Sequence, residues 1–282
     1  MSTRKTITYI LSTNYAGSTM LTLMLGAHSK TLQIGEAKRL RRVNHKQSPC
    51  SLCNTGKPCS LFDGIGPDNI KELYDTLFSR AEDVDVIVDH SKKISWAERY
   101  LDQRDRYDIK FIHLVRDPRS LVRRWDLQFK EKSKLVQRWK LIRKSKDMLL
   151  HAPFCDDTTL YTYKWLCQNR LISRFFVKNN LQSCVLTYRD LVMDTENQLR
   201  RLNDFIGIEY EPQEATYWTT QQHGSGKISD ILHNEGIQLD VRWQDYLSPQ
   251  QKQLVVENRL VTEYLDKLNI TFQDDGLRYN GV

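Results

Sequence analysis

A repeated alternation of short apolar runs and longer amphipathic stretches constrains the fold of this chain more than any other feature. Runs rich in β-branched and other apolar residues predict strands over Thr6–Leu11, Val84–Asp89, Ile109–Val115 and Ser183–Tyr188. Apolar residues at helical spacing predict helices over Gly17–His28, Asn69–Ala81, Ile94–Arg104, Ser120–Leu149, Thr158–Asn179, Thr195–Ile206 and Pro249–Lys267. This alternation indicates an α/β protein built around a mostly parallel sheet.

Unusual polar stretches follow the predicted strands. They read S-T-N-Y-A-G-S-T after the first strand, D-H-S-K-K after the second, R-D-P-R after the third and Y-R-D after the fourth. In open α/β sheets, ligands bind beyond the carboxyl ends of the strands. We therefore expect these stretches to form one site.

The first of these stretches resembles a phosphate-binding loop without its lysine. It leads from a strand into a helix, so the backbone N–H groups of Tyr15 to Thr19 and the positive end of the helix predict an anion cradle. Gly17 permits a close backbone approach, but Ser18 replaces the lysine that reaches the terminal phosphates of ATP. The alternative is an ordinary helix start capped by serine and threonine.

The stretch after the third strand predicts a second anion contact. Arg116 leaves an apolar strand, and Asp117 with Pro118 is typical of a capped helix start. An arginine there could hold a phosphate bidentately. The alternative is an ion pair of Arg116 with Asp117 or another nearby carboxylate.

Taken in order, these motifs resemble the family of sulfotransferases that use PAPS, 3′-phosphoadenosine-5′-phosphosulfate. The resemblance includes the first loop, G-E at Gly35, V-I-V-D-H-S-K, and R-D-P-R with Trp125 nine residues after its first arginine. It continues through L-T-Y-R-D-L-V-M-D-T-E-N-Q-L-R-R-L-N-D-F-I-G-I and H-G-S-G-K to I-Q-L-D-V-R-W-Q-D-Y-L-S. The match is closest to a bacterial branch that carries a short Cys-rich loop after G-E.

The resemblance implies a P-loop-like, three-layer α/β fold with a central, mostly parallel sheet flanked by helices. The chain would form a single domain over 1–282, with variable acceptor-side insertions at about 40–69 and 130–157. The implied PAPS-binding residues are Tyr15, Ala16, Gly17, Ser18, Thr19, Met20, Arg116, Arg124, Tyr188, Gly226 and Lys227.

For catalysis, the resemblance implies a base for the acceptor proton and a cation for the leaving oxygen. Glu36 is the expected base, with His90 as the alternative, and Lys92 is the expected cation. The alternative for Glu36 is an ion pair with Lys38 or Arg39. No metal is expected, because sulfuryl transfer from PAPS leaves no triphosphate to neutralise.

Two residues depart from the family pattern. Many members carry arginine or lysine where this chain has Tyr15, and a serine is usual where it has Arg124. Arginine can also bind a phosphate, so Arg124 implies recognition of the 3′-phosphate by a different contact.

The Cys-rich loop, C-S-L-C-N-T-G-K-P-C, allows two interpretations. His45, Cys50, Cys53 and Cys59 together could hold a structural zinc. The spacing lacks the second Cys or His pair of most zinc motifs, so reduced thiols in a substrate-side loop are the alternative.

Charge and hydropathy limit the remaining functions. A net charge of +7 favours anionic partners, and the basic helical stretch from Arg123 to Lys146 does not indicate sequence-specific nucleic-acid recognition. No apolar run approaches the roughly 18 residues of a membrane span, and the N-terminus lacks the apolar core of a signal peptide. We expect a soluble, cytoplasmic sulfotransferase acting on a small-molecule, lipid or carbohydrate acceptor. A non-catalytic nucleotide- or polyanion-binding protein and a P-loop-type small-molecule kinase are the alternatives.

Overall fold

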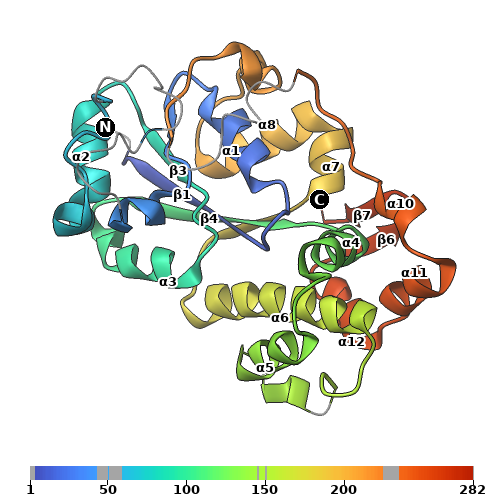
Figure 1. Cartoon of the computed structure of the whole chain (residues 1–282). Helices are drawn as coiled ribbons and strands as arrows, with labels where there is room; N and C mark the ends of the chain where they lie inside the picture. Colours follow the sequence, from blue (N-terminus) through green and yellow to red (C-terminus); the bar gives the residue numbers. More distant parts are fainter. Residues whose placement is uncertain are drawn as a thin grey trace.

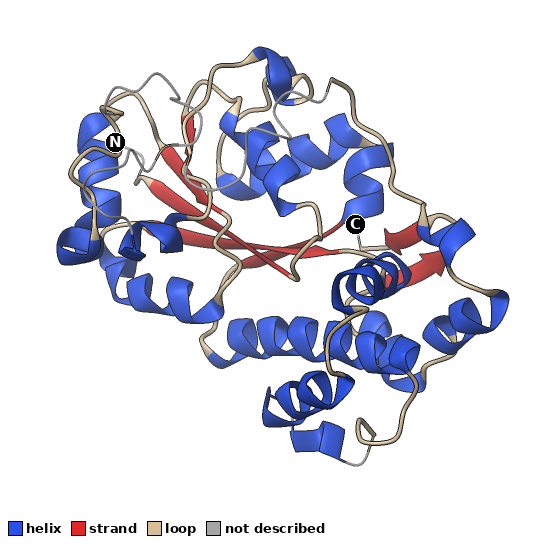
Figure 2. Cartoon of the chain, in the orientation of Figure 1, coloured by secondary structure: helices blue, strands red, loops and turns tan. Residues whose placement is uncertain are grey.

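A computed structural model describes residues 4–42, 50, 59–144, 146–149, 151–224 and 235–281. The described chain forms three layers, with a central parallel sheet between two layers of helices (Figures 1 and 2). This arrangement confirms the predicted α/β class and its parallel sheet. In the described residues no helix is both long and apolar enough to cross a membrane.

The central sheet has five strands in the order β2-β3-β1-β4-β5. Their bounds are β1 Thr6–Ser12, β2 Thr31–Gln33, β3 Val86–Asp89, β4 Asp108–Val115 and β5 Ser183–Thr187. Each neighbouring pair is parallel. Every residue of β1 and β3 is buried, as expected for strands covered by helices on both faces.

Two apolar clusters hold the layers together. On one face, Ile10 of β1 packs with α1 (Ser18–Gly26) and α8 (Thr195–Ile206). On the other face, Tyr9 packs in a cluster with residues of α2 (Leu73–Arg80), α3 (Ile94–Ala97) and α6 (Asp157–Lys178). Alternate residues of β1 therefore pack against the helices on opposite faces of the sheet.

Further helices complete the described fold. They are η1 Ala37–Arg42, η2 Pro67–Glu72, η3 Glu98–Asp105, α4 Pro118–Phe129, α5 Lys134–Lys144, η4 Lys146–Leu149, α7 Tyr188–Met193, η5 Pro212–Glu214, η6 Tyr217–Thr219, α10 Trp243–Tyr246, α11 Pro249–Val256 and α12 Arg259–Asp266.

Several predicted helices are divided in the structure. The stretch predicted as Ser120–Leu149 contains α4, α5 and η4, and the one predicted as Pro249–Lys267 contains α11 and α12. Asn258 causes the second division, because its side chain accepts a hydrogen bond from the backbone N–H of Val261 and so caps a new helix. The helices predicted over Asn69–Ala81 and Ile94–Arg104 are likewise each part 3₁₀ and part α-helix.

A C-terminal hairpin was not predicted from the sequence. Strands β6 (Ile270–Gln273) and β7 (Gly276–Tyr279) pair antiparallel beside α7 (Figure 1). Asp190 of α7 accepts a hydrogen bond from the backbone N–H of Tyr279 at 2.7 Å, and Arg189 pairs with Asp275. The hairpin thus supports the helix that follows β5.

Candidate functional site

The loop after β1 enters α1 with an unusual backbone. Tyr15 and Gly17 both have positive φ, 69° and 99°, and no side chain caps the first turn of α1. Gly17, Ser18, Thr19 and Met20 line a cavity at this end of α1, where the first N–H groups of a helix have no partner within the helix. Ala16 is fully buried in the apolar cluster under α1, so it supports the loop rather than facing the cavity.

Tyr188 explains why the loop requires glycine at position 17. A Cβ at Gly17 would lie 2.6 Å from Cδ2 of Tyr188. The Tyr188 hydroxyl donates a hydrogen bond to the carbonyl of Gln238 at 3.2 Å, and its ring stacks under the Arg116 guanidinium at 4.2 Å. Tyr188 therefore forms a wall between the loop and the segment around residue 238.

Arg116 joins the loop to the C-terminal part of the chain. Its Nη1 donates to the carbonyl of Tyr15 at 3.0 Å, and its Nη2 pairs with Asp240 at 2.7 Å. Asp117 is not its partner, because that carboxylate caps α4 and pairs with Arg119 at 2.7 Å. The Nε of Arg116 is buried and has no hydrogen-bond partner among the described residues.

The two departures from the family pattern contact each other. The guanidinium of Arg124 lies 4.4 Å from the centroid of the Tyr15 ring, within the range of a cation–π interaction. Arg124 thus brings a positive charge to the loop at Tyr15.

Glu36 and Lys92 lie together on the other side of the cavity. Lys92 Nζ is 3.1 Å from Oε1 of Glu36, and Arg39 Nε is 2.6 Å from Oε2. Lys38 is the third cation, at 3.8 Å. Burial raises the pKa of Glu36, but Lys92, Arg39 and Lys38 together outweigh it and lower that pKa to about 2.

His90 lies beside this pair and lines the same cavity. It is 2% exposed, and its Nδ1 has no hydrogen-bond partner in the described chain. Burial, reinforced by the charge of Lys92, lowers the pKa of His90 to about 3. The imidazole is therefore neutral at neutral pH.

Asp89 fixes the loop that carries His90 and Lys92. Its fully buried carboxylate accepts hydrogen bonds from Tyr74 at 2.9 Å, from Trp96 at 2.7 Å, and from the N–H and hydroxyl of Ser91 at 2.7 and 2.5 Å. Burial raises the pKa of Asp89, although all these donors act against it. These bonds hold a loop in which Lys92 has a positive φ of 59°.

The cavity that unites these residues is large and strongly basic. Its volume is about 1230 Å³, and among the described residues nine Lys or Arg side chains line it, with Glu36 and Asp240 as the only acids. The predicted residues Tyr15, Gly17, Ser18, Thr19, Met20, Glu36, His90, Lys92, Arg116, Arg124 and Tyr188 all line it. The convergence expected at the carboxyl ends of the strands is therefore present.

Some functional candidates were missed by the sequence analysis. Asp240 lies between Arg116 and Arg242. Nε of Arg242 donates to Oδ1 of Asp240 at 2.7 Å, and Nη2 of Arg242 donates to Oδ2 at 2.8 Å. Hydrogen bonds from Arg242, reinforced by Arg116, lower the pKa of Asp240. Only the D-V-R spacing of the I-Q-L-D-V-R-W segment could have indicated this pair.

Other predicted residues lie outside the part of the chain that the structure describes. These are Gly226 and Lys227 of the H-G-S-G-K segment, and His45 and Cys53 of the predicted zinc set. Cys50 and Cys59 are described and buried. They lie close to His223, which the sequence analysis did not assign.

Two solved structures resemble the chain over most of its length. The sulfotransferase domain from the curacin biosynthetic pathway has a TM-score of 0.55 and 17% identity, covering 92% of this chain and 97% of that domain. The sulfotransferase domain from the Synechococcus PCC 7002 olefin synthase has a TM-score of 0.52 and 20% identity, covering 90% and 95%. No family model and no curated protein matches the sequence.

The chain therefore has the sulfotransferase fold. This result confirms the fold that the ordered motifs implied. Identities of 17% and 20% establish the architecture, and the role of each side chain follows from chemistry.

Proposed function

We propose that this protein transfers a sulfuryl group from PAPS to a hydroxyl or amine of an acceptor by in-line displacement. The observation that carries the proposal is the meeting of the β1–α1 loop, Arg116 and Lys92 around one basic cavity. PAPS has two anionic ends, a 5′-phosphosulfate and a 3′-phosphate. The cavity volume of about 1230 Å³ exceeds the roughly 300–1,000 Å³ of common small-molecule pockets, leaving room for an acceptor.

The chain's own groups fit a donor of this kind. The uncapped amides of Gly17, Ser18 and Thr19 would hold the phosphosulfate. Arg116 and Arg124 would hold the 3′-phosphate, and the buried Nε of Arg116 is an unused donor for it among the described groups. The Tyr188 ring would contact the adenine. From the sequence alone, Gly226 and Lys227 remain candidates for the 3′-phosphate.

The donor supplies an activated sulfuryl group on a phosphate leaving group. Glu36 accepts the proton of the acceptor hydroxyl, and Lys92 balances the charge that develops on the leaving oxygen. The products are 3′,5′-ADP and the sulfated acceptor. The ion pair of Lys92 and Glu36 supports these roles, because it keeps base and cation adjacent.

Lys92 links donor binding to the strength of the base. In the ligand-free protein its charge lowers the pKa of Glu36 and also that of His90. When Lys92 turns toward an anionic donor, Arg39 and Lys38 remain beside Glu36 but the charge of Lys92 acts on it less, so the pKa of Glu36 rises. A base with a higher pKa accepts the acceptor proton more readily. His90, neutral and with Nδ1 unpartnered in the described chain, is the alternative base.

Transfer of labelled sulfate from PAPS tests the proposal directly. Water and a panel of small-molecule, lipid and carbohydrate acceptors would be compared for wild type, Glu36→Gln, His90→Asn and Lys92→Ala. Lys71→Ala, an exposed lysine outside the cavity lining, is the control. We expect Lys92→Ala to lower kcat by roughly 10²-fold or more, and Glu36→Gln by about 10²–10⁴-fold.

Other results would favour the alternatives. Transfer that survives both Glu36→Gln and Lys92→Ala would refute these catalytic roles. If instead His90→Asn alone abolishes transfer, His90 is the base. Binding of 3′,5′-ADP with no transfer to any acceptor or water would indicate a non-catalytic binding protein, and phosphoryl transfer from Mg-ATP would indicate a kinase.

A further inference from the structure

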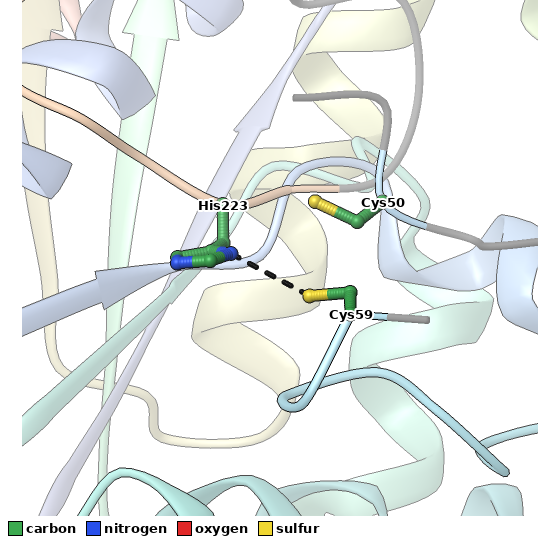
Figure 3. A group of neighbouring side chains, drawn as sticks. All are labelled: Cys50, Cys59 and His223. Atoms are coloured by element: carbon green, nitrogen blue, oxygen red, sulfur yellow. Dashed lines mark hydrogen bonds between the residues drawn. The ribbon is translucent and has the colours of Figure 1, made fainter. Parts of the chain in front are cut away.

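Two cysteines and a histidine from distant parts of the chain meet outside the lining of the basic cavity. Cys50 and Cys59 belong to the Cys-rich loop, and His223 follows η6. The two Sγ atoms and a ring nitrogen of His223 all lie within 4.8 Å of one another. Figure 3 shows both sulfur atoms and the imidazole gathered around one space.

The spacing between Cys59 and His223 matches a tetrahedral zinc site. Zinc bonds of roughly 2.3 Å to sulfur and 2.0–2.1 Å to nitrogen, at tetrahedral angles, place sulfur and nitrogen roughly 3.5 Å apart. Sγ of Cys59 is 3.5 Å from Nδ1 of His223, the contact drawn in Figure 3. Thiolate and imidazole are also the ligands that zinc prefers in structural sites.

Hydrogen bonds from neighbouring groups orient the cluster, as they do around the ligands of known zinc sites. The backbone N–H of Gly224 donates to Sγ of Cys50 at 3.4 Å, a contact that stabilises a thiolate. Gln33 of β2 donates a hydrogen bond to the carbonyl of His223, which holds this segment against the central sheet. Both cysteines are buried and His223 is half-buried, so bulk water is largely kept from the three ligand atoms.

We propose that Cys50, Cys59 and His223 supply three of the four ligands of a structural zinc ion. The ion would connect the Cys-rich loop to the segment that follows η6. These two parts of the chain are far apart in the sequence. None of the three residues lines the basic cavity, so the inference does not rest on the proposed function. Relative to the set expected from the sequence, His223 joins Cys50 and Cys59, and His45 and Cys53 lie outside the described residues.

The metal content of the purified full-length protein tests the proposal. Wild type, Cys59→Ser, His223→Gln and the control Cys155→Ser would be purified without chelators and analysed by elemental mass spectrometry. Cys155 lies beside Arg138, away from this cluster, so its loss leaves the site intact. We expect one zinc per chain in wild type and in Cys155→Ser, and a large loss in the other two variants.

Two further measurements apply if the site variants do not fold. Cobalt added to the chelator-treated wild type would give a thiolate-to-metal charge-transfer band, and zinc added back would raise the thermal midpoint that chelation lowered. Equal zinc in wild type and Cys59→Ser would overturn the proposal. So would an unreduced intact mass with Cys50 and Cys59 joined in a disulfide, or a wild type free of zinc that gives no cobalt band.

Discussion

At the residue scale, Gly17 combines a backbone requirement with a packing requirement. Its φ of 99° is unfavourable for any residue with a Cβ, and an added Cβ would approach Tyr188 to 2.6 Å. Gly64 shares the positive φ, at 70°, but no described atom lies within 4 Å of its Cβ position. Substitutions at Gly17 and Gly64 can therefore be compared to separate the cost of backbone strain from the cost of a steric clash.

We expect Gly17→Ala to lower the free energy of unfolding by about 2–4 kcal/mol and Gly64→Ala by about 1–2 kcal/mol. Only Gly17→Ala should also weaken binding of 3′,5′-ADP, because only that change displaces the loop and Tyr188. Urea unfolding and calorimetry measure the two effects. Equal losses in both variants, with unchanged nucleotide affinity, would contradict the close packing of loop and ring.

Glu214 makes stability depend on pH. Its carboxyl is fully buried, accepting hydrogen bonds from Asn203 at 2.6 Å and from the N–H of Glu211 at 3.0 Å. Burial raises its pKa from 4.5 to about 7. The folded state therefore binds the proton more tightly than the unfolded state, so the contribution of Glu214 to stability falls as pH rises from about 4.5 to about 7.

Glu214→Gln should remove this loss, which is on the order of 3 kcal/mol. Relative to wild type, the variant should gain stability between about pH 5 and about pH 8, as measured by urea unfolding at both values. Comparison with wild type cancels the opposite contribution of His90, whose lowered pKa reduces stability in acid. Glu209→Gln, at an exposed position, is the control. Parallel pH curves for wild type and Glu214→Gln would refute a buried, protonated Glu214.

At the scale of elements, Arg119 connects α4 to the C-terminal hairpin. It forms a buried ion pair with Asp117 at 2.7 Å, stacks on Trp243 at 3.9 Å and donates to the carbonyl of Gln273 at 2.6 Å. The second arginine of R-D-P-R therefore fixes the helix whose first turn follows Arg116. Removing one partner of a buried ion pair leaves the other charge unpaired.

Arg119→Met should lower the free energy of unfolding by about 3–5 kcal/mol. Arg200→Met is the matched control, because its pair with Glu196 is exposed and spans one helical turn. Arg200→Met should lower the free energy of unfolding by about 0.5 kcal/mol or less. Urea unfolding of both variants provides the comparison, and losses of similar size would show that Arg119 does not anchor the hairpin.

The elements that the sequence predicted well are those determined by local patterns. Four of the five parallel strands are short apolar runs, and their positions were predicted within about two residues, whereas β2, with three residues, was not among the predicted strands. The divided helices were missed because apolar spacing continues across a cap such as Asn258. The site residues on the strand-end loops were predicted from the sequence, whereas the contacts of Asp240 with Arg116 and of His223 with Cys59 join residues that are far apart in the sequence.

At the scale of the whole molecule, the fold concentrates positive charge at one edge of the sheet. The cavity there receives residues from the loops after β1, β3, β4 and β5, and its lining is dominated by lysine and arginine. Such a field favours a multiply charged anion and weakens as salt screens it. We propose that this anion is a nucleotide carrying a 3′-phosphate.

Calorimetric titration with 3′,5′-ADP, with ATP as the competitor and Arg116→Ala as the variant, tests that claim most directly. We expect 3′,5′-ADP to bind without added metal and more tightly than ATP, with roughly tenfold or greater loss of affinity in Arg116→Ala, since a charged hydrogen bond contributes about 1.5–3 kcal/mol. Binding of Mg-ATP in preference to 3′,5′-ADP, or no binding of 3′,5′-ADP at all, would contradict the account.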